Sequence, residues 1–184
     1  EISLEGREYP GYYMRLNQRG GVQDYYLYGN RLNFTDLQSY KNWFERVKGY
    51  TQNVRNSLEI NKEGLELGYT QPKLVTRGVS AQIGAMLERD LEDHPYFKIF
   101  KNVGDVASPE DALALQNEVK EYIQNVLNPT YQELYDFLIN EYLPESRDTI
   151  GISDVPNGKE WYEYLARYHT TTNLTPDEIH EIGL

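Results

Sequence analysis

Apolar residues recur every three or four positions through most of this chain, and this spacing is the feature that most constrains its fold. The clearest run lies within residues 35–60 and consists of Leu37, Tyr40, Trp43, Phe44, Val47, Tyr50, Val54 and Leu58. This period places the run on one side of an amphipathic α-helix. Thr35 and Gln38 have the spacing of a capping box and predict the helix start. Gly64 and Gly68 are expected to break the stretch that follows.

Three more helices are predicted in the middle of the chain. One opens at Pro72 and ends at the His-Pro pair 94–95, because the residue before a proline avoids the helical region. The next begins at the Ser-Pro pair 108–109, where a cap and a proline occupy their favoured positions. The Asn-Pro pair 128–129 is expected to kink or break it, and the last of the three continues to Pro144.

The two ends of the chain differ in how strongly they are patterned. Residues 1–33 are rich in Tyr and Gly and predict short helical pieces or irregular structure. After a glycine-containing loop at 151–158, a last complete helix carries an apolar face of Trp161, Tyr164, Leu165 and Tyr168. Thr175 and Glu178 then form a capping box around Pro176, which starts a helix that has room for only about two and a half turns. We therefore expect the chain to be a fragment of a longer protein.

These patterns predict an all-α fold in which long helices pack side by side, because strand-like alternation of any length is absent from the sequence. The 184 residues are enough for a single helical domain spanning 1–184. No apolar run is long enough for a transmembrane segment. Lys and Arg number 18 against 29 Asp and Glu, so the net charge is −11, which argues against nucleic acid as a partner. The chain has no cysteine, so disulfides, thiolate nucleophiles and cysteine-bound zinc are excluded.

Tyrosine is unusually abundant, with 17 residues against five Phe and two Trp. Its ring packs like an apolar side chain, but its hydroxyl needs a hydrogen-bond partner. Two interpretations follow. The tyrosines are half-buried packing residues, or they line a polar, aromatic cleft.

The histidines do not form a metal site in this sequence. His180-Glu181 looks like the beginning of the zinc-binding HExxH pattern, but Leu184 stands where the second histidine is required. His94 precedes a proline at a predicted helix end, where an imidazole interacts favourably with the helix dipole. His169 is followed by three threonines, which either cap the preceding helix or line a substrate groove. We assign no catalytic or metal-binding residue to the chain.

Several motifs in the second half of the chain occur together in one bacterial family. A proline followed by tyrosine lies within residues 127–138, a Tyr-Leu-Pro helix end at 142–144, and a glycine loop at 156–158. The run Tyr-Glu-Tyr-Leu follows at 162–165, and a Thr-Thr pair and the run Thr-Pro-Asp-Glu-Ile-His lie within 169–184. In this combination the chain resembles the family catalogued as domain of unknown function 885. The resemblance is strong over residues 108–184, and the earlier helices match only in order and spacing.

The resemblance implies a long, mostly helical, zincin-like protein of which this chain is the N-terminal part. Family members carry a HExxPGHH-type motif further along, which would supply zinc ligands and a general base acting on metal-bound water. That motif is absent here, so zinc is expected only in the full-length protein and its C-terminal catalytic half is the expected partner. The resemblance also implies a lipoprotein or secreted protein in the periplasm or cell envelope, although a cytoplasmic location remains compatible with the sequence.

Two hypotheses about function remain open. In the first, the chain is the non-catalytic helical part of a metallopeptidase-like hydrolase and forms part of a peptide-binding cleft. Its contacts with peptides would come from His169, from the hydroxyls of Thr170, Thr171 and Thr172, and from the aromatic rings of Tyr162 and Tyr168. In the second, the chain is a helical binding or scaffold module without catalysis, and the threonines serve as helix caps.

Overall fold

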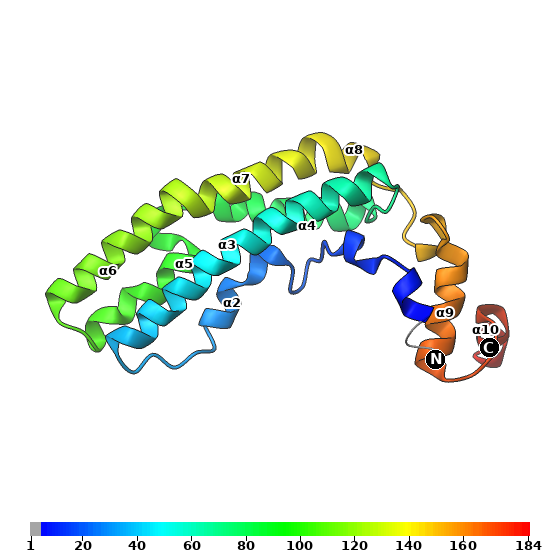
Figure 1. The fold of residues 1–184 in the computed structure, drawn as a ribbon, viewed down its shortest axis with the longest axis horizontal. Coiled ribbons are helices and arrows are strands. Elements are labelled where there is room, and N and C mark those ends of the chain that lie inside the picture. The colour runs from blue at the N-terminus through cyan, green and yellow to red at the C-terminus, as the bar shows by residue number, and fades with distance from the viewer. Residues whose placement is uncertain (1–4) are drawn as a thin grey trace.

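The computed structural model describes residues 5–184, and within this range the protein is built from helices, as the sequence predicts. Figure 1 shows an elongated, curved bundle with a smaller helical pair at one end. The helices of the bundle are α2 (Tyr26–Gly29), α3 (Leu37–Glu66), α4 (Lys73–Leu87), α5 (Pro95–Lys98), α6 (Pro109–Tyr122), α7 (Asn128–Phe137) and α8 (Leu143–Glu145). The pair consists of α9 (Gly158–Thr170) and α10 (Pro176–Ile182). None of the described helices is both long enough and apolar enough to cross a bilayer.

The longest helix, α3, begins one residue later and ends later than the sequence predicts. Its N-cap is Asp36 rather than Thr35, and the capping partner is Ser39, whose backbone N–H donates to Asp36 Oδ1 at 2.7 Å. A carboxylate at the N-cap accepts a hydrogen bond from a backbone N–H of the first turn as well as a hydroxyl does, so both Thr35 and Asp36 are suitable N-cap residues. Gly64 lies inside the helix instead of breaking it. A Cβ there would lie 2.9 Å from the Tyr13 Cβ, so glycine lets the N-terminal segment cross the helix closely.

The helices α6, α7 and α8 form one continuous curved rod, although the sequence predicts a kink or break at Pro129 (Figure 1). A short π-helical turn precedes each proline: η6 (Ile123–Leu127) before Pro129 and η7 (Leu138–Tyr142) before Pro144. The residue just before each proline donates its N–H to the carbonyl five residues back. A π-turn of this kind accommodates a residue that cannot make the usual i to i−4 bond, so the rod continues through both prolines.

The expected end of the second helix at His94 is also wrong. The helix α4 ends at Leu87, and a 3₁₀ turn, η4 (Leu91–Asp93), follows it. His94 is the N-cap residue of α5 and is fully buried, so its imidazole does not meet the negative end of a helix dipole. Pro95 therefore starts a helix rather than ending one, which is the other position that proline tolerates.

The N-terminal segment consists of short helical pieces, in agreement with its sequence. They are η1 (Gly6–Glu8), η2 (Gly11–Met14), η3 (Val22–Asp24) and α2. Figure 1 shows this segment running along the concave side of the bundle from α9 towards the opposite end of α3. It contacts α3 through η2 and η3, and α4 through η3.

The apolar core has two parts. The main cluster lies between α3, α4, α5 and the rod, and its largest fully buried side chains include Trp43, Tyr96, Phe97, Phe100 and Tyr131. The smaller cluster joins α9 to the N-terminal segment and contains Val155, Trp161 and Tyr164. Tyr96 and Tyr131 keep their buried hydroxyls bonded, because they share a 2.9 Å hydrogen bond and Tyr131 donates to the Val22 carbonyl at 2.7 Å. These two tyrosines are packing residues, and they are fully buried rather than half-buried as the first interpretation predicts.

Candidate functional site

The residues that the sequence nominates for substrate contact all lie on α9 or in the turn that joins it to α10. The turn into α9 is tight: Asn157 has the left-handed φ of 55°, and a Cβ on Gly158 would lie 2.1 Å from the Ile152 carbonyl oxygen. One face of α9 is buried, since Trp161 and Tyr164 stack on Tyr9 with ring centroids 5.7 and 5.3 Å apart. The opposite face of α9 is left for α10 and for solvent.

The start of α10 confirms the capping box read from the sequence. The Glu178 backbone N–H donates to Thr175 Oγ1 at 3.2 Å, and the Thr175 backbone N–H donates to Glu178 Oε2 at 2.8 Å. The bonds from Thr175 hold the pKa of the Glu178 carboxyl below its ordinary value. Pro176 follows the cap directly, and its fixed φ suits the first turn of α10.

A groove of about 360 Å³ lies between the two helices. It is bounded mainly by apolar atoms, and we call it the α9–α10 groove. Its lining residues are Tyr162, Leu165, Ala166, His169, Thr170, Pro176 and Ile179. Three of the six nominated residues, Tyr162, His169 and Thr170, therefore meet at one surface.

The other three nominated residues lie outside this lining. The ring of Tyr168 packs near Tyr164 at 5.8 Å and against the edge of His169 at 5.1 Å. Thr171 is the C-cap residue of α9 and has a left-handed φ of 57°. Thr172 Oγ1 is 3.0 Å from Thr170 Oγ1. These threonines shape the turn from α9 to α10.

Four lining residues were missed in the sequence: Leu165, Ala166, Pro176 and Ile179. Leu165 and Ala166 lie three and four positions after Tyr162, so helical spacing alone could have placed them on its face. Pro176 and Ile179 share a face of α10 for the same reason. The helical spacing could not predict the direction in which α10 folds back onto α9.

The strained cap gives a first prediction. Replacing Thr171 with glycine should stabilise the protein by about 1 kcal/mol, because a β-branched residue at positive φ is strained and glycine is not. The midpoint of thermal unfolding should rise by a few degrees. Thr172→Gly is the matched control and should be neutral or destabilising, since it removes the contact with Thr170 and adds freedom to the unfolded chain. A lower midpoint for Thr171→Gly would mean that the left-handed cap at this position is not strained.

Residues 5–184 contain no cluster of side chains that fits a zinc ion. Within residues 5–184, His, Cys, Asp and Glu side chains nowhere gather in a group of three or more that could hold a metal ion. His180 and Glu181 are both exposed on α10. A zinc ion of the kind that the resemblance implies would need ligands from outside residues 5–184.

Comparison with known proteins agrees with the helical architecture. The family described as "Bacterial protein of unknown function (DUF885)" matches residues 3–184. The chain belongs to this family. The match extends well beyond residues 108–184, so the N-terminal helices are as much a part of the DUF885 pattern as α9 and α10 are.

A solved structure shares the DUF885 chain's fold. It is described as "The crystal structure of the putative lipoprotein from Colwellia psychrerythraea", and it superposes with a TM-score of 0.82 at 20% sequence identity. The superposition covers 92% of this chain and 30% of the Colwellia chain. This DUF885 chain therefore spans less than a third of that protein. None of the curated proteins matches the sequence.

Proposed function

We propose that this chain is the N-terminal helical part of a metallopeptidase-like hydrolase, and that the α9–α10 groove forms one wall of its peptide-binding cleft. The observation that carries the proposal is the meeting of Tyr162, His169 and Thr170 at an open, largely apolar groove. Tyr162 is 51% exposed, so much of its ring is free to contact a bound molecule. Ligand sites typically combine an apolar lining with a few polar groups of this kind.

The groove provides for binding rather than for chemistry. Leu165 and Ile179 would contact an apolar side chain of the peptide, and the ring of Tyr162 would cover it. His169 can donate or accept a hydrogen bond, and the Thr170 hydroxyl accepts while it donates to the Ala166 carbonyl at 2.7 Å. We assign no proton transfer, nucleophile or metal ligand to residues 5–184.

The length of the Colwellia relative supports the idea of a larger protein. The superposition covers 30% of that chain, so the remaining 70% lies outside it. This remaining length is enough for a catalytic half. The relative is described as a "putative lipoprotein", so we propose an envelope location for the present protein as well. We also propose that the catalytic half of the full-length protein binds zinc.

The groove can be tested in the full-length protein by kinetics on peptide substrates. Tyr162→Ala and Ile179→Ala should each raise KM at least fivefold, because they remove apolar surface from the bound state, and should leave kcat and the thermal midpoint nearly unchanged. Tyr28→Ala is the control, since Tyr28 is 62% exposed and lies on α2, outside the groove. Unchanged KM for both groove variants in an active enzyme would exclude the groove from the cleft.

A second function has support from the turn between α9 and α10. The Thr170 hydroxyl is engaged within its own helix end, and Thr171 closes that helix, so these residues already have a structural role. A helical scaffold module would need nothing more from them. In that case the full-length protein would hydrolyse no peptides, and Thr171→Val would alter stability alone.

A further inference from the structure

A second cavity lies within the bundle, and its lining residues are far along the chain from those of the α9–α10 groove. It has a volume of about 380 Å³ and lies where three separate segments meet: the stretch from η3 through α2, the C-terminal end of α4, and the stretch from η4 through α5. We call it the α4–α5 pocket. Its size falls in the range of small-molecule sites in proteins.

One wall of the α4–α5 pocket is fixed by a buried glutamine. Gln23 is 2% exposed, and its Nε2 donates both to the Asn17 carbonyl and to Gln82 Oε1, each at 2.8 Å. Gln82 Nε2 in turn donates to the Gln18 carbonyl at 3.0 Å. This network ties the N-terminal segment to α4, so the wall is organised before any ligand arrives.

The pocket carries charges of both signs that are not fully used by the protein. Asp24 accepts the Gly20 backbone N–H at Oδ2 and leaves Oδ1 without a partner within residues 5–184. The Arg89 guanidinium makes neither a hydrogen bond nor an ion pair with any described residue. Lys98 and Asp93 already face one another at 3.6 Å, so their charges largely cancel. Among the described residues, the Oδ1 atom of Asp24 and the guanidinium of Arg89 therefore border the pocket without a protein partner.

We propose that the α4–α5 pocket binds a free α-amino acid with an apolar side chain. A guanidinium recognises a carboxylate through two parallel N–H donors, so Arg89 holds the α-carboxylate. Asp24 Oδ1 accepts from the α-ammonium group. Ala85, Met86 and Pro95 also border the pocket and give the side chain an apolar surface. Because Arg89 lies at the exposed rim, the dissociation constant should be on the order of 1 mM.

Three matched probes test the proposal by calorimetry on the purified protein. L-leucine carries both charges, L-leucine amide lacks the carboxylate, and N-acetyl-L-leucine lacks the ammonium group. L-leucine should bind, and each analogue should bind at least tenfold more weakly. Arg89→Gln and Asp24→Asn should each weaken L-leucine binding at least tenfold, and the asparagine keeps an oxygen for the Gly20 bond. Arg77→Gln is the control, because Arg77 lies on α4 outside the pocket and should leave the affinity unchanged.

Each alternative outcome overturns the proposal. Absence of L-leucine binding at 20 times the expected constant, about 20 mM, would show that the pocket does not take amino acids. Equal binding of the three probes would show that the two charges are not read. Unchanged affinity in both pocket variants, with their thermal midpoints intact, would place the binding elsewhere on the protein.

Discussion

Replacing Trp43 with alanine is expected to lower the free energy of unfolding by about 4 kcal/mol, a loss typical of a large aromatic side chain removed from a packed core. Trp43 is 1% exposed in the N-terminal third of α3, and its ring stacks on Tyr25 with centroids 5.3 Å apart. Gly29 fits directly against the same ring, since a Cβ there would lie 2.6 Å from it. Alanine would leave a large cavity where α2 and the N-terminal segment meet the bundle. Urea unfolding followed by circular dichroism gives the free energy.

A matched aromatic control separates the loss of packing from the loss of any aromatic ring. Tyr28 is 62% exposed and belongs to the same N-terminal segment, so Tyr28→Ala should change the free energy of unfolding by less than 1 kcal/mol. A loss below 1 kcal/mol for Trp43→Ala would mean that the N-terminal segment does not pack on α3 as described.

Lowering the pH from 7 to 4 is expected to remove about 3 kcal/mol of stability through His94 alone. Burial lowers the pKa of His94 from 6.5 to about 4, and the nearby Arg89 charge acts in the same direction, while the Asn128 side chain partly offsets them. In the unfolded chain the imidazole takes up a proton below pH 6.5, and in the folded protein it does so only near pH 4. The contribution of the neutral His94 side chain to the free energy of unfolding is therefore fully present above pH 6.5 and is lost as the pH falls from 6.5 to 4.

The pH dependence of His94 is measured against a non-titrating variant. Carboxylates also titrate in this window, so the free energy of unfolding of the wild type and of His94→Gln is compared at each pH. The wild type should lose about 3 kcal/mol more than the variant between pH 7 and pH 4. His169→Gln is the control, because His169 is exposed, and should follow the wild type. Parallel curves for the wild type and His94→Gln would show that His94 titrates normally in the folded protein.

The sequence was sufficient to predict the fold class and most helix positions, because the apolar period is a local signal. Ser108 and Thr175 are the N-caps that the sequence predicts, and the short helical pieces of residues 5–33 follow from their glycines. The exceptions have tertiary causes. Gly64 stays helical because Tyr13 packs on it. Pro129 is accommodated by a π-turn, and the hydrogen bonds of this turn cannot be predicted from a residue pattern.

The candidate site could be predicted only in part. Tyr162, His169 and Thr170 share a face of α9 and line one groove, and their contact with a substrate stays a prediction. Thr171 and Thr172 have another role because the left-handed cap at Thr171 turns the chain before α10 begins. The α4–α5 pocket was not predicted from the sequence, because its walls come together through the packing of distant segments, as the 59-residue separation of the Gln23–Gln82 bond shows.

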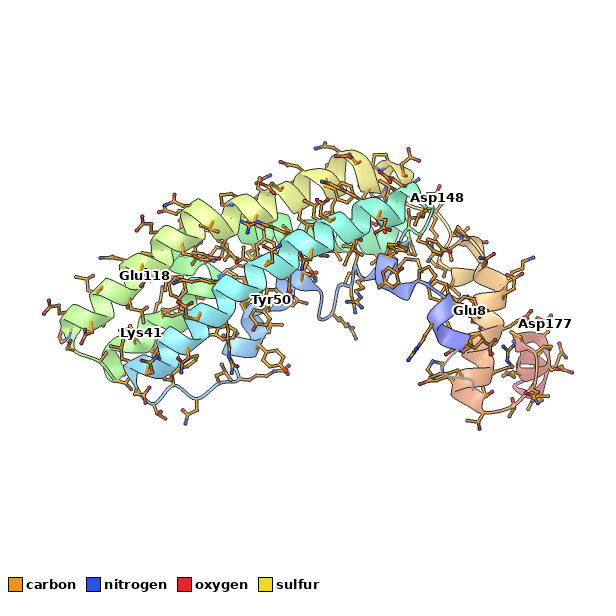
Figure 2. The ribbon with its side chains drawn as sticks, viewed as in Figure 1. Glu8, Lys41, Tyr50, Glu118, Asp148 and Asp177 are labelled. Atoms are coloured by element: carbon orange, nitrogen blue, oxygen red, sulfur yellow. The ribbon has the colours of Figure 1, made fainter. Side chains whose placement is uncertain are left out.

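Figure 2 labels Lys41, Glu118, Asp148 and Asp177, which are all exposed charged side chains. Ion pairs at this surface, such as Lys48 with Glu118 at 3.0 Å and Lys73 with Asp148 at 2.9 Å, join neighbouring elements. Exposed pairs of this kind contribute little to stability, about 0–1 kcal/mol each. The stability of the protein therefore rests on its aromatic core.

The proposed contact between the α9–α10 groove and a peptide is tested most directly by photo-crosslinking in the full-length protein. A photoreactive phenylalanine analogue would replace Tyr162 in one sample and Tyr28 in the other, with the same peptide substrate added to both. We expect that the peptide is attached at position 162, that excess unlabelled peptide prevents the attachment, and that position 28 gives none. Attachment at neither position, or equal attachment at both, would contradict a peptide-binding role for the groove.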